Sequence, residues 1–165
     1  MNTTLNNCSG GELYFENTDF ETLYFTDSRI QNISQSSSQW YWNYEYPDEK
    51  INFDSYMIEE DKIKDGQKRL LDVDNPLVVP EGTKIKFLIT GNDVMHSFFI
   101  PSLAVQVYSI AGRINEVWTE IPKGPKTYYG QCNQICGVNH AYMPCLLYTS
   151  PSPRDLSTSR MPSSA

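Results

Sequence analysis

Twelve residues in the last quarter of the sequence hold a dense group of metal-binding side chains. Cys132, Cys136, His140 and Met143 share this short segment, although the whole chain has only four cysteines, two histidines and five methionines. Thiol, imidazole and thioether groups form a soft ligand set, which favours copper over hard cations and over zinc, a metal rarely bound by methionine. The fold is therefore expected to hold this segment as a metal loop, with the other histidine, His96, as a further ligand.

The number of cysteines separates two kinds of copper site. A mononuclear blue-copper centre needs one thiolate, two imidazoles and an axial thioether, and has no use for a second cysteine. Three residues separate Cys132 from Cys136, so both thiols can bridge two ions, with one histidine on each ion. Met143 would bind one copper and the backbone carbonyl of Gln134 the other. The alternatives are a strained local disulfide, or a zinc site that would leave Met143 without a role.

Charge and hydropathy limit the classes of function. The 165 residues suffice for one domain with tails, and the formal net charge is −7 with a pI of about 4.7. An acidic surface disfavours nucleic acid and favours a basic protein partner. No run approaches the roughly eighteen apolar residues of a membrane span, and the mean hydropathy is −0.47. The first residues lack the apolar core of a signal peptide and the Arg-rich character of a transit peptide.

Composition divides the chain into three parts. Residues 1–38 are polar and rich in Asn, Ser and Thr, which predicts an extended arm and linker; Cys8 in this arm is expected to be a free thiol. Residues 39–144 form the predicted folded domain. Residues 145–165 are rich in Ser, Thr and Pro, and are interpreted as a low-complexity tail that is not native sequence.

The middle part carries the pattern of a β protein. Trp40, Trp42, Tyr44 and Tyr46 recur with a period of two, as in a half-buried strand. Turn residues separate further predicted strands at 51–57, 69–73, 76–79, 84–90, 96–100, 106–110, 114–119 and 126–130. Many short strands without a helical period predict an all-β sandwich or barrel of the Greek-key type.

Six segments together resemble the copper-A (CuA) domain of cytochrome c oxidase subunit II. They occur in the family's order within residues 39–144, roughly two thirds of the chain: Gln39–Tyr46, Phe53–Met57, Arg69–Asn75, Val94–Ser97, Ala111–Asn115 and Tyr129–Met143. The resemblance implies a cupredoxin-like Greek-key β-sandwich. It also implies a dinuclear copper centre with the ligands His96, Cys132, Gln134, Cys136, His140 and Met143.

The same resemblance implies a role and a set of partners. The domain would accept electrons from cytochrome c and pass them to haem a in subunit I of an oxidoreductase, while the isolated domain is an electron carrier only. Trp40 resembles the residue through which electrons enter, although aromatic strand residues also serve packing alone. Glu45, Asp74 and Asp93 match acidic positions that face the cytochrome. The implied location is the mitochondrial inner membrane, on its intermembrane-space side.

Two features depart from the family pattern. Gln134 stands where the family usually has Glu, whose carboxylate reaches a magnesium ion at the subunit I interface; a neutral amide makes magnesium binding doubtful. The family's membrane hairpin is missing, which implies a split or truncated subunit held at the membrane by subunit I and a separate membrane part of subunit II. The remaining alternatives are the CuA domain of nitrous oxide reductase, a copper-carrier or assembly cupredoxin, and a disulfide-bonded β-domain without metal.

Overall fold

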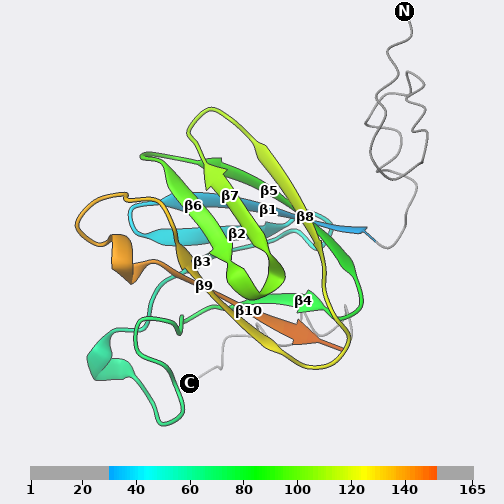
Figure 1. Cartoon of the computed structure of the whole chain (residues 1–165), viewed down its shortest axis with the longest axis horizontal. Helices are drawn as coiled ribbons and strands as arrows, with labels where there is room; N and C mark the ends of the chain where they lie inside the picture. The colour runs from blue at the N-terminus through cyan, green and yellow to red at the C-terminus, as the bar shows by residue number, and fades with distance from the viewer. Residues whose placement is uncertain (1–29, 152–165) are drawn as a thin grey trace, which may run out of the picture.

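Two five-stranded sheets pack face to face in the computed structural model, which describes residues 30–151 (Figure 1). The first sheet has the order β3-β2-β1-β5-β8 and the second the order β4-β10-β9-β6-β7. The strands are β1 (Ile30–Ser38), β2 (Tyr41–Tyr46), β3 (Ile51–Ser55), β4 (Leu77–Pro80), β5 (Lys84–Gly91), β6 (His96–Ile100), β7 (Val105–Ser109), β8 (Asn115–Glu120), β9 (Thr127–Cys132) and β10 (Pro144–Ser150). The predicted all-β sandwich is confirmed.

The helical content of the described part is confined to single turns. They are the 3-10 helices η1 (Glu60–Lys62), η2 (Pro101–Leu103) and η3 (His140–Tyr142). Within residues 30–151, no helix is long and apolar enough to cross a bilayer.

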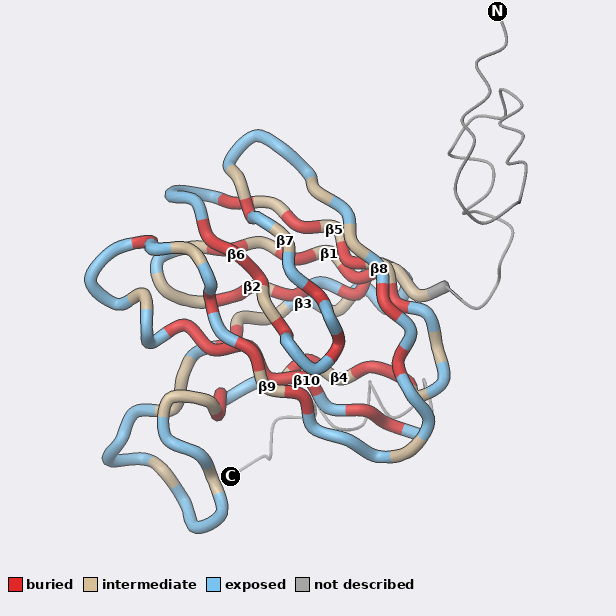
Figure 2. The backbone as a smooth tube through the Cα atoms, viewed as in Figure 1, coloured by how far each residue is buried: buried red, intermediate tan, exposed pale blue. Residues whose placement is uncertain are grey.

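Alternating side chains of β2 build much of the core between the sheets. Trp42, Tyr44 and Tyr46 are each 0% exposed, whereas the residues between them face outward. The Trp42 ring meets the Phe98 ring of β6 edge to face, with centroids 5.4 Å apart. The Phe87 ring of β5 lies 5.5 Å from the Phe98 ring. Figure 2 shows the resulting alternation of buried and exposed positions along the strands. The core therefore fixes the two sheets relative to each other.

The predicted linker over residues 30–38 is wrong, because this segment is β1 at the centre of the first sheet. It pairs antiparallel with β2 and parallel with β5. Its inward side chains Ile33, Gln35 and Ser37 are buried, and Ser37 Oγ lies 2.6 Å from Ser109 Oγ of β7. Pairing on both sides and a buried hydroxyl pair hold a strand that has little apolar character. Residues 1–29, with Cys8 and the rest of the predicted arm, lie outside the described residues.

The predicted domain boundary at residue 144 also differs from the structure. Strand β10 lies between β9, which it pairs antiparallel, and β4, which it pairs parallel. Cys145, Leu146 and Leu147 are at most 2% exposed, so this strand contributes to the core. Residues 152–165 of the predicted tail lie outside the described part of the chain.

The long connection between β3 and β4 contains the one predicted strand, at residues 69–73, that is wrong. Leu70 has a φ of +65°, and the pairing there is limited to an isolated bridge between Met57 and Val73. Charged side chains of this connection pair at the surface, as in Arg69 with Glu60. Backbone turns therefore stand where the apolar residues of this segment predicted an extended strand.

Candidate metal centre

Three chain segments meet at one end of the sandwich to form the candidate centre. His96 begins β6, Cys132 ends β9, and these two strands pair antiparallel, so the two side chains come to the same rim. Residues 133–143 form a loop that starts and ends beside this rim. The N–H of Cys132 donates to the carbonyl of Met143 at 3.0 Å, and the N–H of Asn133 donates to the carbonyl of Ser97 at 3.0 Å. The sheet therefore fixes the root of the loop.

The two predicted thiols and the two predicted imidazoles come together where the loop meets β6. The Sγ atoms of Cys132 and Cys136 are 3.8 Å apart, nearly twice the length of a disulfide bond, and both thiols are free. Nδ1 of His96 lies 4.0 Å from Sγ of Cys132, and Nδ1 of His140 lies 3.5 Å from Sγ of Cys136. The carbonyl oxygen of Gln134 lies 3.3 Å from Sγ of Cys132. Each thiol thus has an imidazole nitrogen of its own.

Burial protects the centre on the side of the core. His96 is 0% exposed and its ring lies edge-on to the Trp42 ring, with centroids 6.2 Å apart. Met143 is 1% exposed at the far end of the loop, and its carbonyl accepts the Cys132 N–H. His140 is half-buried at the start of η3. The predicted ligands therefore combine a buried inner side with an outer side nearer to solvent.

The two thiols differ in pKa because ionisation of one opposes ionisation of the other. Burial opposes ionisation of Cys132, but contacts with His96 and with the backbone of Ser97 and Gln134 outweigh burial and lower its pKa to about 6. Burial and the neighbouring Cys132 charge raise the pKa of Cys136 to about 12. The first proton therefore leaves the pair easily and the second is retained until a cation compensates the added charge.

The donor set fits a pair of soft metal ions. Within residues 30–151, His96, Cys132 and Cys136 form a cluster whose possible ligand atoms all lie within 4.8 Å of one another, and His140 adjoins it through Cys136. Two sulfurs in contact, flanked by two imidazole nitrogens, suit copper and not a hard cation. These residues could therefore hold a soft metal ion.

The turn between β1 and β2, residues 39–40, is hydrogen-bonded to the ligand loop. The carbonyl of Cys136 accepts two hydrogen bonds, from Nε2 of Gln39 at 3.0 Å and from Nε1 of Trp40 at 3.2 Å. Gly137 follows with a φ of +122°, and a Cβ there would lie 2.9 Å from the Trp40 ring. The sequence predicted a role for Trp40 but not for Gln39 or Gly137. Their only signal in the sequence is position, since Gln39 precedes Trp40 and Gly137 follows Cys136.

The three predicted docking acids occupy different surroundings. Glu45 is exposed near the end of β2, five residues beyond Trp40, which is on the order of 16 Å along a strand. Asp74 accepts the backbone N–H groups of Tyr56 and Asn75, each at 2.7 Å. Asp93 lies next to His96, with its carboxylate turned toward the imidazole. The three carboxylates therefore differ in their local contacts, and their docking role stays a prediction.

A family model decides what kind of domain this is. The model for the periplasmic domain of cytochrome c oxidase subunit II matches residues 30–150. The chain belongs to the cytochrome c oxidase subunit II family. This membership confirms the resemblance seen in the sequence, and its range includes both β1 and β10.

Individual relatives agree with the family model. A probable cytochrome c oxidase subunit 2 of Rickettsia prowazekii is 54% identical over 107 residues, which cover 64% of this chain and 34% of the relative. Cytochrome c oxidase subunit 2 of Metridium senile is 50% identical over 131 residues, covering 76% of this chain and 52% of the relative. The chain thus spans about half or less of the length of these relatives.

A solved structure matches the fold of this subunit II domain. The crystal structure of the periplasmic domain of subunit II of cytochrome oxidase (CoxB) of Bradyrhizobium japonicum superposes with a TM-score of 0.70 at 39% identity. The match covers 78% of this chain and 89% of that one. The prediction of a cupredoxin-like sandwich is confirmed by this likeness.

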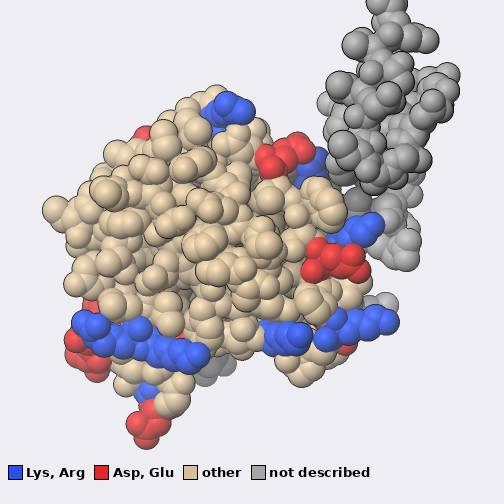
Figure 3. Space-filling model, in the orientation of Figure 1, with Lys and Arg blue, Asp and Glu red and all other residues tan. Residues whose placement is uncertain are grey.

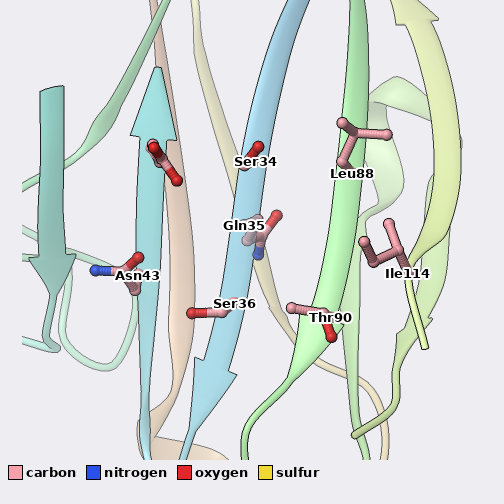
Figure 4. Close-up of a pocket in the computed structure, with 8 residues that line it drawn as sticks. Ser34, Gln35, Ser36, Asn43, Leu88, Thr90 and Ile114 are labelled. Atoms are coloured by element: carbon pink, nitrogen blue, oxygen red, sulfur yellow. The ribbon is translucent and has the colours of Figure 1, made fainter. Parts of the chain in front are cut away.

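One hollow elsewhere on the described part of the domain has neither Cys nor His in its lining. A hollow of about 170 Å³ on the outer face of the first sheet is lined by Ser34, Asn43, Thr90 and neighbouring residues, none of them Cys or His (Figure 4). In the view of Figure 3, charged side chains gather along the margins of the face, and the middle over β6, β7 and β9 shows other residues. The ligand loop therefore remains the candidate site.

Proposed function

We propose that this subunit II domain holds a dinuclear copper centre and transfers electrons within a respiratory cytochrome c oxidase. The observation that carries the proposal is the convergence of two free thiols in contact, each with an imidazole nitrogen within 4.0 Å. The ligands would be the side chains of His96, Cys132, Cys136, His140 and Met143, with the carbonyl of Gln134. Bound copper would supply a one-electron couple.

The chain's own contribution would be a rigid ligand frame. The backbone bonds at the root of the loop and the two donors to the Cys136 carbonyl restrain the cysteines independently of any metal. A site that is already formed needs little rearrangement when its charge changes, which favours fast electron transfer. Deprotonation of both thiols would accompany metal loading, because the ligand form of cysteine is the thiolate.

Electrons would enter from cytochrome c near Trp40, whose indole is bonded to the backbone of Cys136. The acidic chain, with Glu45 and Asp74 at its surface, would attract a basic cytochrome in a weak, salt-sensitive encounter. Haem a of subunit I would receive the electron. Subunit I and a membrane part of subunit II would hold the domain at the mitochondrial inner membrane, on the intermembrane-space side.

Two rivals differ from this proposal in testable ways. A copper-carrier or assembly protein would use the same ligands for a labile or mononuclear site, and would release copper readily to a chelator. The CuA domain of nitrous oxide reductase would share the centre, but membership of the subunit II family favours the oxidase. We assign no magnesium to the side chain of Gln134, because a neutral amide is a weaker magnesium ligand than a carboxylate.

Rapid mixing of the copper-loaded chain with ferrocytochrome c tests the proposal. We expect the oxidised centre to be reduced in a second-order reaction that slows as salt rises. Trp40→Phe should lower the rate constant more than about tenfold, or about 1.4 kcal/mol in the barrier, with copper content unchanged. Trp118→Phe is the matched control, because Trp118 is 61% exposed on β8 of the first sheet. Equal rates for all three chains would refute the proposed role of Trp40, and absence of reduction would refute the proposed function.

A further inference from the structure

The carboxylate of Asp93 is bonded to three different groups. Its Oδ1 lies 3.0 Å from Nε2 of His96 and accepts the backbone N–H of Val94 at 2.7 Å. Its Oδ2 accepts the backbone N–H of Gln39 at 2.7 Å. The side chain is 32% exposed, whereas the imidazole that it contacts is 0% exposed. Both oxygens therefore face the protein, although the residue belongs to an exposed loop between β5 and β6.

This contact bears on which nitrogen of His96 carries a proton. Nδ1 of the ring faces Sγ of Cys132, and Nε2 faces Asp93 on the opposite side. A neutral imidazole that binds a metal through Nδ1 must carry its proton on Nε2. A carboxylate at Nε2 accepts that proton's hydrogen bond, so it selects the tautomer and fixes the rotation of the ring.

The same carboxylate also connects two segments that are distant in sequence. Gln39 donates its backbone N–H to Asp93 and its side-chain N–H to the carbonyl of Cys136. The backbone just before Trp40 is thereby tied both to the loop that precedes His96 and to the loop between the two cysteines and Met143. Removal of one carboxylate would loosen the tie to the first loop and leave the second in place.

We propose that Asp93 is a positioning residue of the metal centre, which holds His96 with Nδ1 toward the cysteines and fastens the Gln39 backbone beside it. The inference rests on the proposed function, because it assigns His96 as a metal ligand. It differs from the sequence interpretation of Asp93 as a residue that faces cytochrome c. A docking acid acts on a partner, whereas a positioning acid changes the centre when no partner is present.

Glu45 provides the matched control for Asp93. It is a surface acid of the same domain, it was assigned the same docking role from the sequence, and it is exposed on β2 away from the ligand loop. Removal of either carboxylate changes the net charge of the chain by the same amount. Any difference between the two variants in the absence of cytochrome c therefore reports on local contacts and not on overall charge.

Copper binding by the full 165-residue chain gives the first test. Asp93→Ala should weaken copper affinity, measured by competition with a chelator, about 10- to 100-fold, as loss of an outer hydrogen-bond partner of a ligand histidine does elsewhere. Asp93→Asn retains an acceptor for Nε2–H, so it should keep most of the affinity but raise the reduction potential, because a negative charge next to the ligand is lost. Glu45→Ala and Glu45→Gln should match the wild type in both measurements.

Nitrogen NMR of the metal-free chain, with its cysteines reduced, gives a second test whose first measurement needs only the wild type. At alkaline pH, His96 should show the proton on Nε2, and Asp93→Ala should turn this into a mixture of tautomers. A proton on Nδ1 in the wild type would overturn the inference. So would equal copper affinity and potential in the Asp93 and Glu45 variants when the wild type binds its copper pair. Failure of the wild type itself to bind two coppers would instead refute the proposed function.

Discussion

The ligand loop, residues 132–143, and the charged loop, residues 56–76, are both long connections of the sandwich. They differ in how deeply their residues are buried. In the ligand loop, the two thiols are buried against each other, and the Cys136 carbonyl accepts hydrogen bonds from Gln39 and Trp40 in the turn between β1 and β2. In the charged loop, η1 has no buried residue and its ion pairs lie at the surface. The ligand loop is thus held by buried groups, whereas the charged loop is mostly exposed and touches the strands through single side chains, such as Tyr56 on Tyr41 and Lys68 over Tyr129.

This difference indicates where substitutions should matter. Exposed ion pairs are screened by solvent and contribute little, whereas buried donors without partners are costly. Substitutions in the ligand loop are therefore expected to disturb metal binding, which needs fixed ligand positions. The charged loop should tolerate changes that leave its capping hydrogen bonds intact.

The largest effect is expected from Cys136→Ser. A hydroxyl cannot replace a bridging thiolate for a soft metal, so the variant should bind at most one copper per chain. Metal analysis after gel filtration measures this loss. Cys145→Ser is the control, because Cys145 is buried beside the carbonyl of Phe99 and belongs to β10. Full binding of two coppers by Cys136→Ser would contradict the bridging role.

The next effect compares a glycine from each loop. Gly137 and Gly66 both have a positive φ, of +122° and +90°. A Cβ at Gly137 would lie 2.9 Å from the Trp40 ring, whereas a Cβ at Gly66 would meet nothing within 4 Å. Strained backbone should cost each alanine variant about 1–3 kcal/mol of unfolding free energy. Only Gly137→Ala should also displace the Trp40 indole and weaken copper binding. Denaturant unfolding and indole fluorescence measure both effects, and an unchanged Trp40 environment would argue against close packing.

A moderate effect is expected from Asp74→Ala in the charged loop. This carboxylate accepts two backbone N–H groups at 2.7 Å, from Tyr56 and Asn75. Its loss should lower the unfolding free energy by about 1–2 kcal/mol, without any change in the copper spectrum. Asp74→Asn should recover part of the loss, because the amide oxygen still accepts. A shifted copper spectrum would show that the two loops are coupled.

The smallest effect is expected from Arg69→Ala. Its guanidinium pairs with Glu60, and both side chains are about 60% exposed. Such pairs contribute at most about 1 kcal/mol, less at high salt. Thermal unfolding at two salt concentrations should therefore place the variant close to the wild type. A large loss of stability would mean that the charged loop is held more tightly than its exposure indicates.

Sequence patterns predicted best the elements that local chemistry determines. Strand β6 begins and ends where the pattern placed it, and the period of two in β2 matched its buried face. The metal ligands could be named because soft donors within twelve residues are informative without tertiary knowledge. The convergence of His96 with them followed from placing strand ends at one rim.

Elements that depend on distant partners could not be predicted in this way. Strand β1 has polar residues such as Gln35 and Ser37 on its inner face, and its place comes from pairing with β2 and β5. Strand β10 is buried except at Tyr148, but it lies beside a Ser- and Pro-rich stretch, so composition concealed it. The inward turn of Asp93 depends on the backbone of Gln39, fifty-four residues away in sequence. The pairing of β1 and the contact between Asp93 and Gln39 have no signature in a single sequence.

Copper stoichiometry combined with electron paramagnetic resonance tests the central claim most directly. The 165-residue chain, with its cysteines reduced before loading with copper and then freed of excess metal, should hold two copper atoms. Its mixed-valence form should give a spectrum in which one unpaired electron couples to both nuclei. A single copper per chain, or a spectrum with coupling to one nucleus, would contradict a pair of ions bridged by Cys132 and Cys136.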